Sequence, residues 1–151
     1  MKVFRSLAVA VFLFTVSASL SLADEPGRHP AYLHALSDLR DARAHLDRLT
    51  PSDRLDNEEE HAIAEIDRAI AEIKRASIDD GKDIHDHMPV DAHLDRRGRY
   101  HKALELLDKA HNDVAREEDN SFAHGLRDRA IHHIDEAHHI VDHLIIQASG
   151  N

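Results

Sequence analysis

Two stretches of the sequence carry the same pattern of apolar side chains, and this repeat constrains the fold more than any other feature. Corresponding positions lie 68 residues apart: Tyr32, Ala35, Leu36, Leu39, Ala42 and Leu46 match Tyr100, Ala103, Leu104, Leu107, Ala110 and Val114. The segments that follow keep this offset: Ala62, Ile63, Ile66, Asp67 and Ala69 match Ala130, Ile131, Ile134, Asp135 and Ala137. Apolar residues three and four positions apart form one face of an α-helix. The repeat therefore predicts two similar helical hairpins.

Two hairpins that each have one apolar face close most simply as an antiparallel four-helix bundle, which is an all-α fold. The spacing predicts helices over residues 30–49, 51–77, 99–118 and 122–148, with N-terminal caps at Thr50 and at Asn120-Ser121. Hairpins 30–78 and 99–148 are then joined by a long loop at 79–98, where Pro89 and Gly98 interrupt the periodicity. Residues 24–151 are predicted to form a single domain.

The first 23 residues have the composition of a secretory signal peptide. Lys2 and Arg5 precede an uninterrupted apolar run over residues 7–14, and small residues suit cleavage between Ala23 and Asp24. The run is too short to span a bilayer comfortably. We therefore predict a periplasmic or secreted protein that keeps no stable membrane insertion after cleavage. Because the chain has no cysteine, its core must hold it together without disulfides.

The exported part of the chain is strongly acidic. The whole sequence has 19 Lys and Arg, of which Lys2 and Arg5 lie in the signal segment, so residues 24–151 have 17 against 29 Asp and Glu, a net charge of −12 with histidine neutral. A surface of this sign repels nucleic acid and attracts cations, including metal ions and basic peptides. All 15 histidines lie in this segment, so their full protonation would move the formal charge to +3.

Three segments resemble a family of small exported bacterial proteins. They are HPAYLHALSDLR at residues 29–40, ASIDDGKD at residues 76–83 and VAREED at residues 114–119. The resemblance covers nearly all of residues 24–151 and implies an exported, all-helical protein. It brings no catalytic residue with it, because it implies no activity.

The last predicted helix offers the first set of candidate metal ligands. His132, Glu136, His139 and His143 follow one another at steps of four, three and four, which stacks them along the face opposite the apolar stripe. Two imidazoles one helical turn apart ligate zinc, copper or nickel, and Glu136 or Asp135 would supply an oxygen or orient a ring. We therefore expect His139 and His143 at the centre of a metal site. The alternative is a solvent-exposed face that binds no metal.

The loop between the hairpins offers the second set. His85 and His87, followed by Met88, resemble a copper or zinc capture site, and several aspartates surround them. For tight binding, this loop would have to fold over the last helix, or a second molecule would have to contribute ligands. The alternative is an acidic, disordered linker.

Two further patterns lie on the other helices. Arg43 and His111 sit near the inward stripe, and we expect them to pair with Asp67 or Asp135 in a structural network. On the first helix, an outward-facing series is predicted at His34, Asp38, Asp41 and His45. The sequence has no nucleophile motif and no phosphate-binding loop, so we do not expect an enzyme.

The leading interpretation is an exported, histidine-rich bundle that binds divalent transition metal at its surface for storage, buffering or delivery. The alternative is a structural or chaperone-like interaction protein whose acidic, histidine-rich surface responds to pH and binds a client protein. Both interpretations predict a monomer or weak dimer that folds without metal. Converging histidines would favour the first, and an exposed apolar groove would favour the second.

Overall fold

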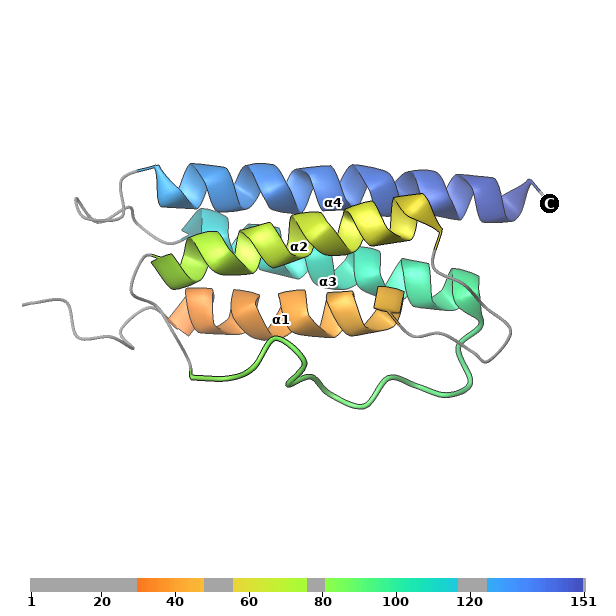
Figure 1. Cartoon of the computed structure of the whole chain (residues 1–151), viewed down its shortest axis with the longest axis horizontal. Coiled ribbons are helices and arrows are strands. Elements are labelled where there is room, and N and C mark those ends of the chain that lie inside the picture. Colours follow the sequence, from red (N-terminus) through yellow and green to blue (C-terminus); the bar gives the residue numbers. More distant parts are fainter. Residues whose placement is uncertain (1–29, 48–55, 76–80, 117–124, 151) are drawn as a thin grey trace, which may run out of the picture.

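The computed structural model describes residues 30–47, 56–75, 81–116 and 125–150, and these residues form four α-helices and no strand (Figure 1). The helices are α1 (Pro30–Asp47), α2 (Asn57–Arg75), α3 (Arg96–Arg116) and α4 (Leu126–Ser149). The prediction of an all-helical fold with four helices is confirmed. The predicted caps at Thr50 and Asn120-Ser121 and the signal segment lie outside the described residues.

Each helix packs against two of the others. Helices α1 and α4 both contact α2 and α3, whereas the backbones of α1 and α4, and those of α2 and α3, are not neighbours within the described residues. Those two pairs therefore lie diagonally across the bundle. Between α2 and α4, Glu72 contacts Arg129 and Glu58 contacts His143, so these two helices run in opposite directions, as Figure 1 shows.

The predicted apolar stripes form the core. On α1 and α2 every apolar residue of the repeat is buried, and those on α3 and α4 are buried with two exceptions, Leu104 and Ile131, which are half-buried. In addition, α3 buries Leu106, which lines a cavity with Asp41 of α1. The buried face of α3 is therefore wider than predicted.

Helix α2 begins later than predicted, at a capping box. Asp56 Oδ1 accepts hydrogen bonds from the backbone N–H groups of Glu58 at 3.0 Å and Glu59 at 2.8 Å. In return, the Glu59 carboxylate accepts one from the N–H of Asp56 at 3.0 Å. This reciprocal pair satisfies N–H groups that have no partner inside the helix, and it fixes the start of α2 at Asn57.

Helix α3 begins earlier than predicted, because Gly98 lies inside its first turn and does not interrupt it. Asp95 caps the helix, and its Oδ1 accepts a hydrogen bond from the N–H of Gly98 at 2.6 Å. A Cβ atom at position 98 would lie 3.0 Å from that oxygen and 3.2 Å from the Leu94 side chain. Glycine is therefore the residue that lets the cap close tightly.

The long connection between α2 and α3 runs along the outside of α1 (Figure 1). Arg40 Nε donates to the carbonyl oxygen of Asp86 at 3.0 Å, and Asp41 Oδ1 accepts from the N–H of Met88 at 2.8 Å. This covering corrects the prediction for the outer face of α1, because His45 is only 8% exposed. Residues 81–95 cover part of the face that the sequence pattern assigned to solvent.

The repeat in the sequence is matched by a repeat in the contacts. Arg43 Nε lies 2.9 Å from Asp67 Oδ1 between α1 and α2, and His111 Nε2 lies 3.5 Å from Asp135 Oδ1 between α3 and α4. Both residues of the second pair lie 68 positions after those of the first. The predicted pairing of Arg43 and His111 with these aspartates is confirmed, although the pairs are partly exposed.

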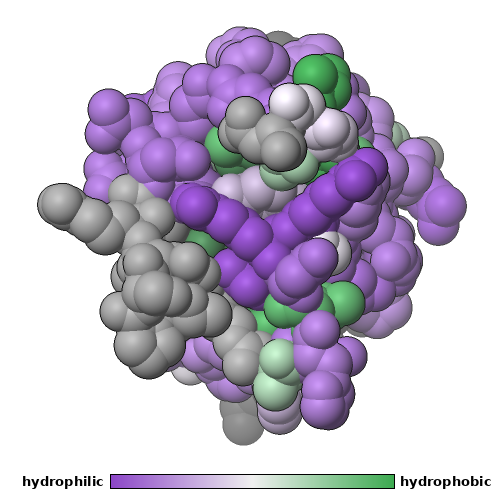
Figure 2. All heavy atoms as spheres, turned by 90° about the vertical axis from the view of Figure 1, so that its right-hand side faces the viewer, coloured by the Kyte–Doolittle hydropathy of each residue, from purple (hydrophilic) through white to green (hydrophobic). Residues whose placement is uncertain are grey.

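The described surface is mostly polar. Figure 2 shows the end of the bundle where α2 begins and α4 ends, and hydrophobic residues appear there only in separate small areas. Among the described residues, the exposed large hydrophobic side chains are Met88 and Ile146. None of the described helices combines the length and the apolar character that a membrane crossing requires.

Candidate functional site

Three glutamates on α2 face α4 at intervals of seven residues, and each contacts a side chain of α4. The nitrogen–oxygen distances are 3.0 Å for Arg129–Glu72, 2.7 Å for His133–Glu65 and 3.0 Å for His143–Glu58. Burial raises the pKa of Glu65, but the hydrogen bond from His133 and the charge of Arg68 outweigh it and lower that pKa below its ordinary value. Glu65 therefore stays ionised, and this seam holds α4 to α2.

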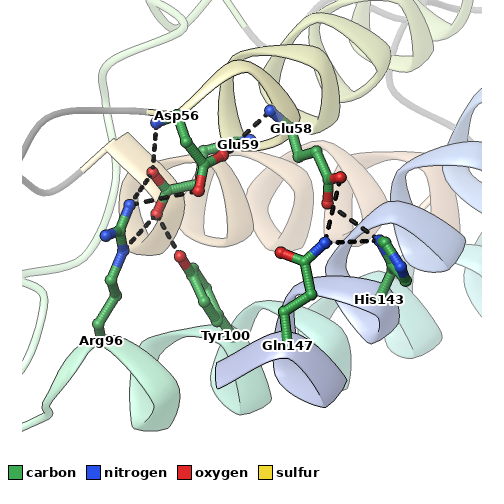
Figure 3. Close-up of polar contacts among 7 residues, drawn as sticks. All are labelled: Asp56, Glu58, Glu59, Arg96, Tyr100, His143 and Gln147. Carbon is green, nitrogen blue, oxygen red and sulfur yellow. Dashed lines mark hydrogen bonds and ion pairs between the residues drawn. The ribbon is translucent and has the colours of Figure 1, made fainter. Parts of the chain in front are cut away.

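A buried carboxylate links α2 to α3 at one end of the bundle (Figure 3). Arg96 donates from Nε to Glu59 Oε1 at 3.0 Å and from Nη2 to Oε2 at 2.5 Å, and the Tyr100 hydroxyl donates to Oε1 at 2.5 Å. Burial raises the pKa of Glu59, but the hydrogen bonds from Arg96 and Tyr100 outweigh it and lower the pKa. Burial and the neighbouring carboxylate both raise the pKa of Tyr100.

The Glu59 cluster is better suited to a structural role than to proton transfer. Glu59 is 2% exposed and Tyr100 3% exposed, and a proton held by the phenol below strongly alkaline pH is not available for transfer. Buried polar groups that satisfy one another fix the relative positions of helices. We therefore assign the Glu59 cluster to the stability of the bundle.

Among the described residues, several potential metal ligands gather between α3 and α4. Three histidines and two aspartates line a recess of about 200 Å³, which we name the α3–α4 groove: Asp108, His111, Asp135, His138 and His139. His138 Nε2 lies 3.1 Å from Asp108 Oδ1, and His111 Nε2 lies 3.5 Å from Asp135 Oδ1. The adjacent rings of His138 and His139 stand at 90° with their centroids 6.2 Å apart.

The structure divides the ligands predicted on the last helix between two interfaces. His139 lines the α3–α4 groove, whereas His143 Nδ1 lies 3.0 Å from Glu58 Oε2 on the α2 side (Figure 3). His132 and Glu136 are exposed and lie outside the groove. The predicted row is divided because α4 packs against both α2 and α3, so residues that share a helix face meet different neighbours.

No ready-made metal centre is found in the part of the chain that the structure describes. There, no group of three or more His, Asp or Glu side chains is already placed to hold one ion. In the α3–α4 groove, two of the imidazoles contact carboxylates. A metal ion would therefore require ring rotation, and its affinity would be set by the cost of that rearrangement.

The predicted loop ligands His85 and His87 do share a cavity, but not with α4. That cavity lies between the loop and α1, and Arg40 and Arg43 line it as well. Because α1 and α4 are diagonal, the loop does not fold over His139 as the two-part metal site would require. Guanidinium groups beside the two imidazoles also disfavour a divalent cation there.

A third recess, of about 470 Å³, lies between α1 and α3. Its charged residues are Asp38, Asp113, Lys109 and Arg116, so acids and bases balance. Burial raises the pKa of Asp38, and the nearby charge of Lys109 opposes this. With balanced charges, this recess has no clear preference for an anion or a cation.

The sequence prediction missed three of the five groove residues as ligands. Asp135 was considered as an oxygen ligand, His111 was expected only in a structural contact, and Asp108 and His138 carried no signal of their own. The signal that could have found them is the position of His138 beside His139 together with an acid three residues before His111. These positions converge only when α3 and α4 pack side by side.

Comparison with known proteins gives no relative: no family model, curated protein or solved structure matches the chain. The function must therefore be inferred from the chemistry of the described residues.

Proposed function

We propose that the mature protein is an exported, antiparallel four-helix bundle that binds divalent transition metal ions in the α3–α4 groove. The observation that carries this proposal is the lining of the groove, where three imidazoles and two carboxylates share a recess of about 200 Å³. Imidazole nitrogens with carboxylate oxygens form the ligand set of zinc, copper(II) and nickel sites. The signal-like segment supports a periplasmic or secreted location, and the net charge of −12 for residues 24–151 favours the approach of cations.

Both carboxylates of the groove already contact imidazole rings, as carboxylates do that orient the histidine ligands of a metal site. Asp135 and Asp108 each lie within 3.5 Å of a ring nitrogen, and a carboxylate in that position orients a ring and raises its basicity toward a metal. Such a site suits buffering or delivery better than permanent storage, because a surface recess that must rearrange exchanges its ion readily. The bundle supplies its own core and does not need the ion to fold.

Zinc titration by calorimetry tests the proposal. A His111→Gln/His139→Gln variant removes one groove histidine from each helix, and a His101→Gln/His132→Gln variant removes one exposed histidine from each helix outside the groove. We expect zinc affinity to fall about tenfold or more in the groove variant and to stay within about twofold in the control. Equal affinities in both variants would contradict the proposal.

A further variant, His143→Gln, distinguishes the groove from the original prediction centred on His139 and His143. His143 contacts Glu58, so its replacement should leave zinc affinity unchanged. A chelator should also leave the helical signal in circular dichroism unchanged, because the apolar core is formed by side chains alone. Loss of helix on chelation would show that metal is structural.

The second candidate function is that of an acidic interaction protein. The charge of −12 for residues 24–151 would attract a basic partner. An extended apolar client-binding surface receives less support, since the exposed large hydrophobic side chains among the described residues are Met88 and Ile146. Absence of zinc binding at micromolar concentration would place this candidate first.

A further inference from the structure

A second recess, between α1 and the crossing loop, differs in chemistry from the α3–α4 groove. We name it the loop pocket; it has a volume of about 330 Å³, and its polar lining consists of Arg40, Arg43, Asp47, His85 and His87. Apolar side chains, including Ile84, complete the wall. The lining thus contains two permanent cations, two imidazoles and one carboxylate.

The pocket is built from fixed parts. Arg40 is 1% exposed, and its Nε donates to the carbonyl oxygen of Asp86 at 3.0 Å. The loop is also held where Asp41 Oδ1 accepts from the N–H of Met88 at 2.8 Å. A buried guanidinium thus lines the recess, and the same guanidinium holds the loop that bears His85 and His87.

The charges around the pocket come from three elements. On α1, Arg43 Nη1 lies 3.0 Å from Asp47 Oδ2, and on α2, Asp67 Oδ1 lies 2.9 Å from Arg43 Nε. These carboxylates offset Arg43. On the loop, Asp83 contacts His85, and Asp86 is exposed to solvent. The lining alone is positive by one charge with neutral histidines and by three with both protonated.

In both loop histidines Nδ1 is hydrogen-bonded, so Nε2 is the ring nitrogen that gains or loses a proton. His87 Nδ1 lies 2.7 Å from the carbonyl oxygen of Met88, and His85 Nδ1 lies 2.9 Å from Asp83 Oδ1. A carbonyl or carboxylate oxygen accepts, so each Nδ1 carries the proton. Nε2 is then an acceptor in the neutral ring and a donor in the protonated ring. Protonation converts both rings into additional hydrogen-bond donors for an anion.

We propose that the loop pocket binds a small tetrahedral oxyanion of the sulfate or phosphate class and that mild acidification strengthens this binding. Guanidinium groups recognise such oxyanions through charge-assisted hydrogen bonds. The same two guanidiniums repel a divalent cation, which is why this pocket is separate from the metal site proposed above. The proposal stands independently of metal binding in the α3–α4 groove.

Sulfate is the best probe, because its charge is the same at both test conditions. Calorimetric titration of the full mature chain with sulfate at about pH 5.5 and about pH 7.5 spans the ordinary titration of histidine. We expect sulfate affinity to be about tenfold higher at the lower pH, with chloride at matched ionic strength giving no comparable heat. Phosphate should bind at the same pocket and compete with sulfate.

Three variants locate the site. His85→Gln/His87→Gln should lose the gain at low pH, and Arg40→Gln should lose binding at both values. The control His93→Gln/His101→Gln removes two exposed histidines outside the pocket and should bind as the parent does. Circular dichroism identifies an Arg40 variant that fails to fold, in which case the histidine variant alone decides.

Three outcomes would overturn the proposal. The first is sulfate binding that is the same in the His85/His87 variant and the parent at both pH values, and the second is an effect of sulfate no larger than that of chloride. The third concerns zinc. A zinc affinity that falls in the His85/His87 variant and not in the groove variant would assign the loop histidines to metal instead. It would contradict both proposals, whereas failure of sulfate binding alone leaves the groove proposal intact.

Discussion

The loop pocket and the α3–α4 groove include equivalent positions of α1 and α3, yet their linings carry opposite charge. Arg40 and Arg43 of α1 correspond, at the 68-residue offset, to Asp108 and His111 of α3. The first pair lines a recess suited to an anion and the second a recess suited to a cation. The apolar stripes that fold both hairpins are nearly the same. The apolar stripe thus fixes each helix, whereas the flanking positions are free to specify binding chemistry.

Equivalent positions outside the apolar stripe also differ in chemistry where the two hairpins meet. Glu65 of α2 and His133 of α4 occupy equivalent positions, and they contact each other at 2.7 Å. A contact between equivalent positions is what a two-fold relation between the hairpins would produce. A carboxylate on one side and an imidazole on the other make the contact attractive, whereas two identical acids would repel.

We expect the largest loss of stability at the start of α2, where the two hairpins are not equivalent. Glu59 corresponds to Arg127, but Glu59 is 2% exposed and bonded to Arg96 and Tyr100, whereas Arg127 contacts the exposed Asp128. Glu59→Gln should destabilise the bundle by about 2 kcal/mol, less than for a fully buried pair because Arg96 reaches solvent. Urea unfolding followed by circular dichroism measures this.

Two controls accompany that measurement. Arg127→Gln should cost less than about 1 kcal/mol, and Glu60→Gln, at the exposed neighbouring position of α2, should change stability by no more than about 0.5 kcal/mol. If Glu59 and Arg127 variants were equally destabilised, the two ends of the bundle would be energetically equivalent and the contrast drawn between them would be wrong.

The effect of intermediate size is the loss of stability in acid, and it depends on two α2 carboxylates that contact the other hairpin. The pKa values of Glu59 and Glu65 are both lowered, since hydrogen bonds from neighbouring side chains outweigh burial. A carboxyl whose pKa is lower in the folded state stabilises the fold above its ordinary value of 4.5. This contribution is lost as pH falls through the lowered value. Unfolding free energy should therefore decline in strong acid.

A Glu65→Gln variant sharpens this prediction. It should lose about 1 kcal/mol at neutral pH, because a charged acceptor for His133 is removed, and its stability should depend less steeply on pH below about pH 4 than that of the parent. Urea unfolding at a series of pH values provides the comparison. An identical acid slope in variant and parent would show that Glu65 has the same pKa in the folded and unfolded chain.

The fold could be predicted further from the sequence than the site could. The stripe residues on α1 and α2 are all buried as expected, because 3.6-residue periodicity needs no knowledge of neighbours. The start of α2 was misplaced because Thr50-Pro51 was interpreted as the cap, whereas in the structure Asp56 and Glu59 form the capping box that precedes Asn57. Gly98 was read as a break because its role in the Asp95 cap is a matter of space.

The site depended on which helices are neighbours, and no local pattern contains that information. His139 and His143 share a helix face, but α3 receives one and α2 the other. His85 and His87 were recognised as a pair, but the arginines beside them come from α1 through the path of the loop. In contrast, the pairing of Arg43 with Asp67 was predictable because both lie at the edge of stripes within one hairpin.

The smallest expected effect lies on the outer faces of α1 and α3. Glu105 contacts Lys102 at 2.8 Å and Lys109 at 2.7 Å, and these two lysines hold the pKa of Glu105 at about 2. The equivalent position on α1 is Ser37. Taken alone, the low pKa would suggest a large contribution to stability. However, the Glu105 side chain is 51% exposed, so solvent and salt screen most of the attraction.

We therefore expect Glu105→Gln to cost only about 0.3 kcal/mol at low salt and to be neutral within error at about 1 M salt. Thermal unfolding at the two salt concentrations measures the difference, with Ser37→Ala as the matched change on α1. A loss above about 1 kcal/mol that persists at high salt would mean that the two lysines hold Glu105 rigidly. The outer face of α3 would then contribute to stability in a way that the outer face of α1 does not.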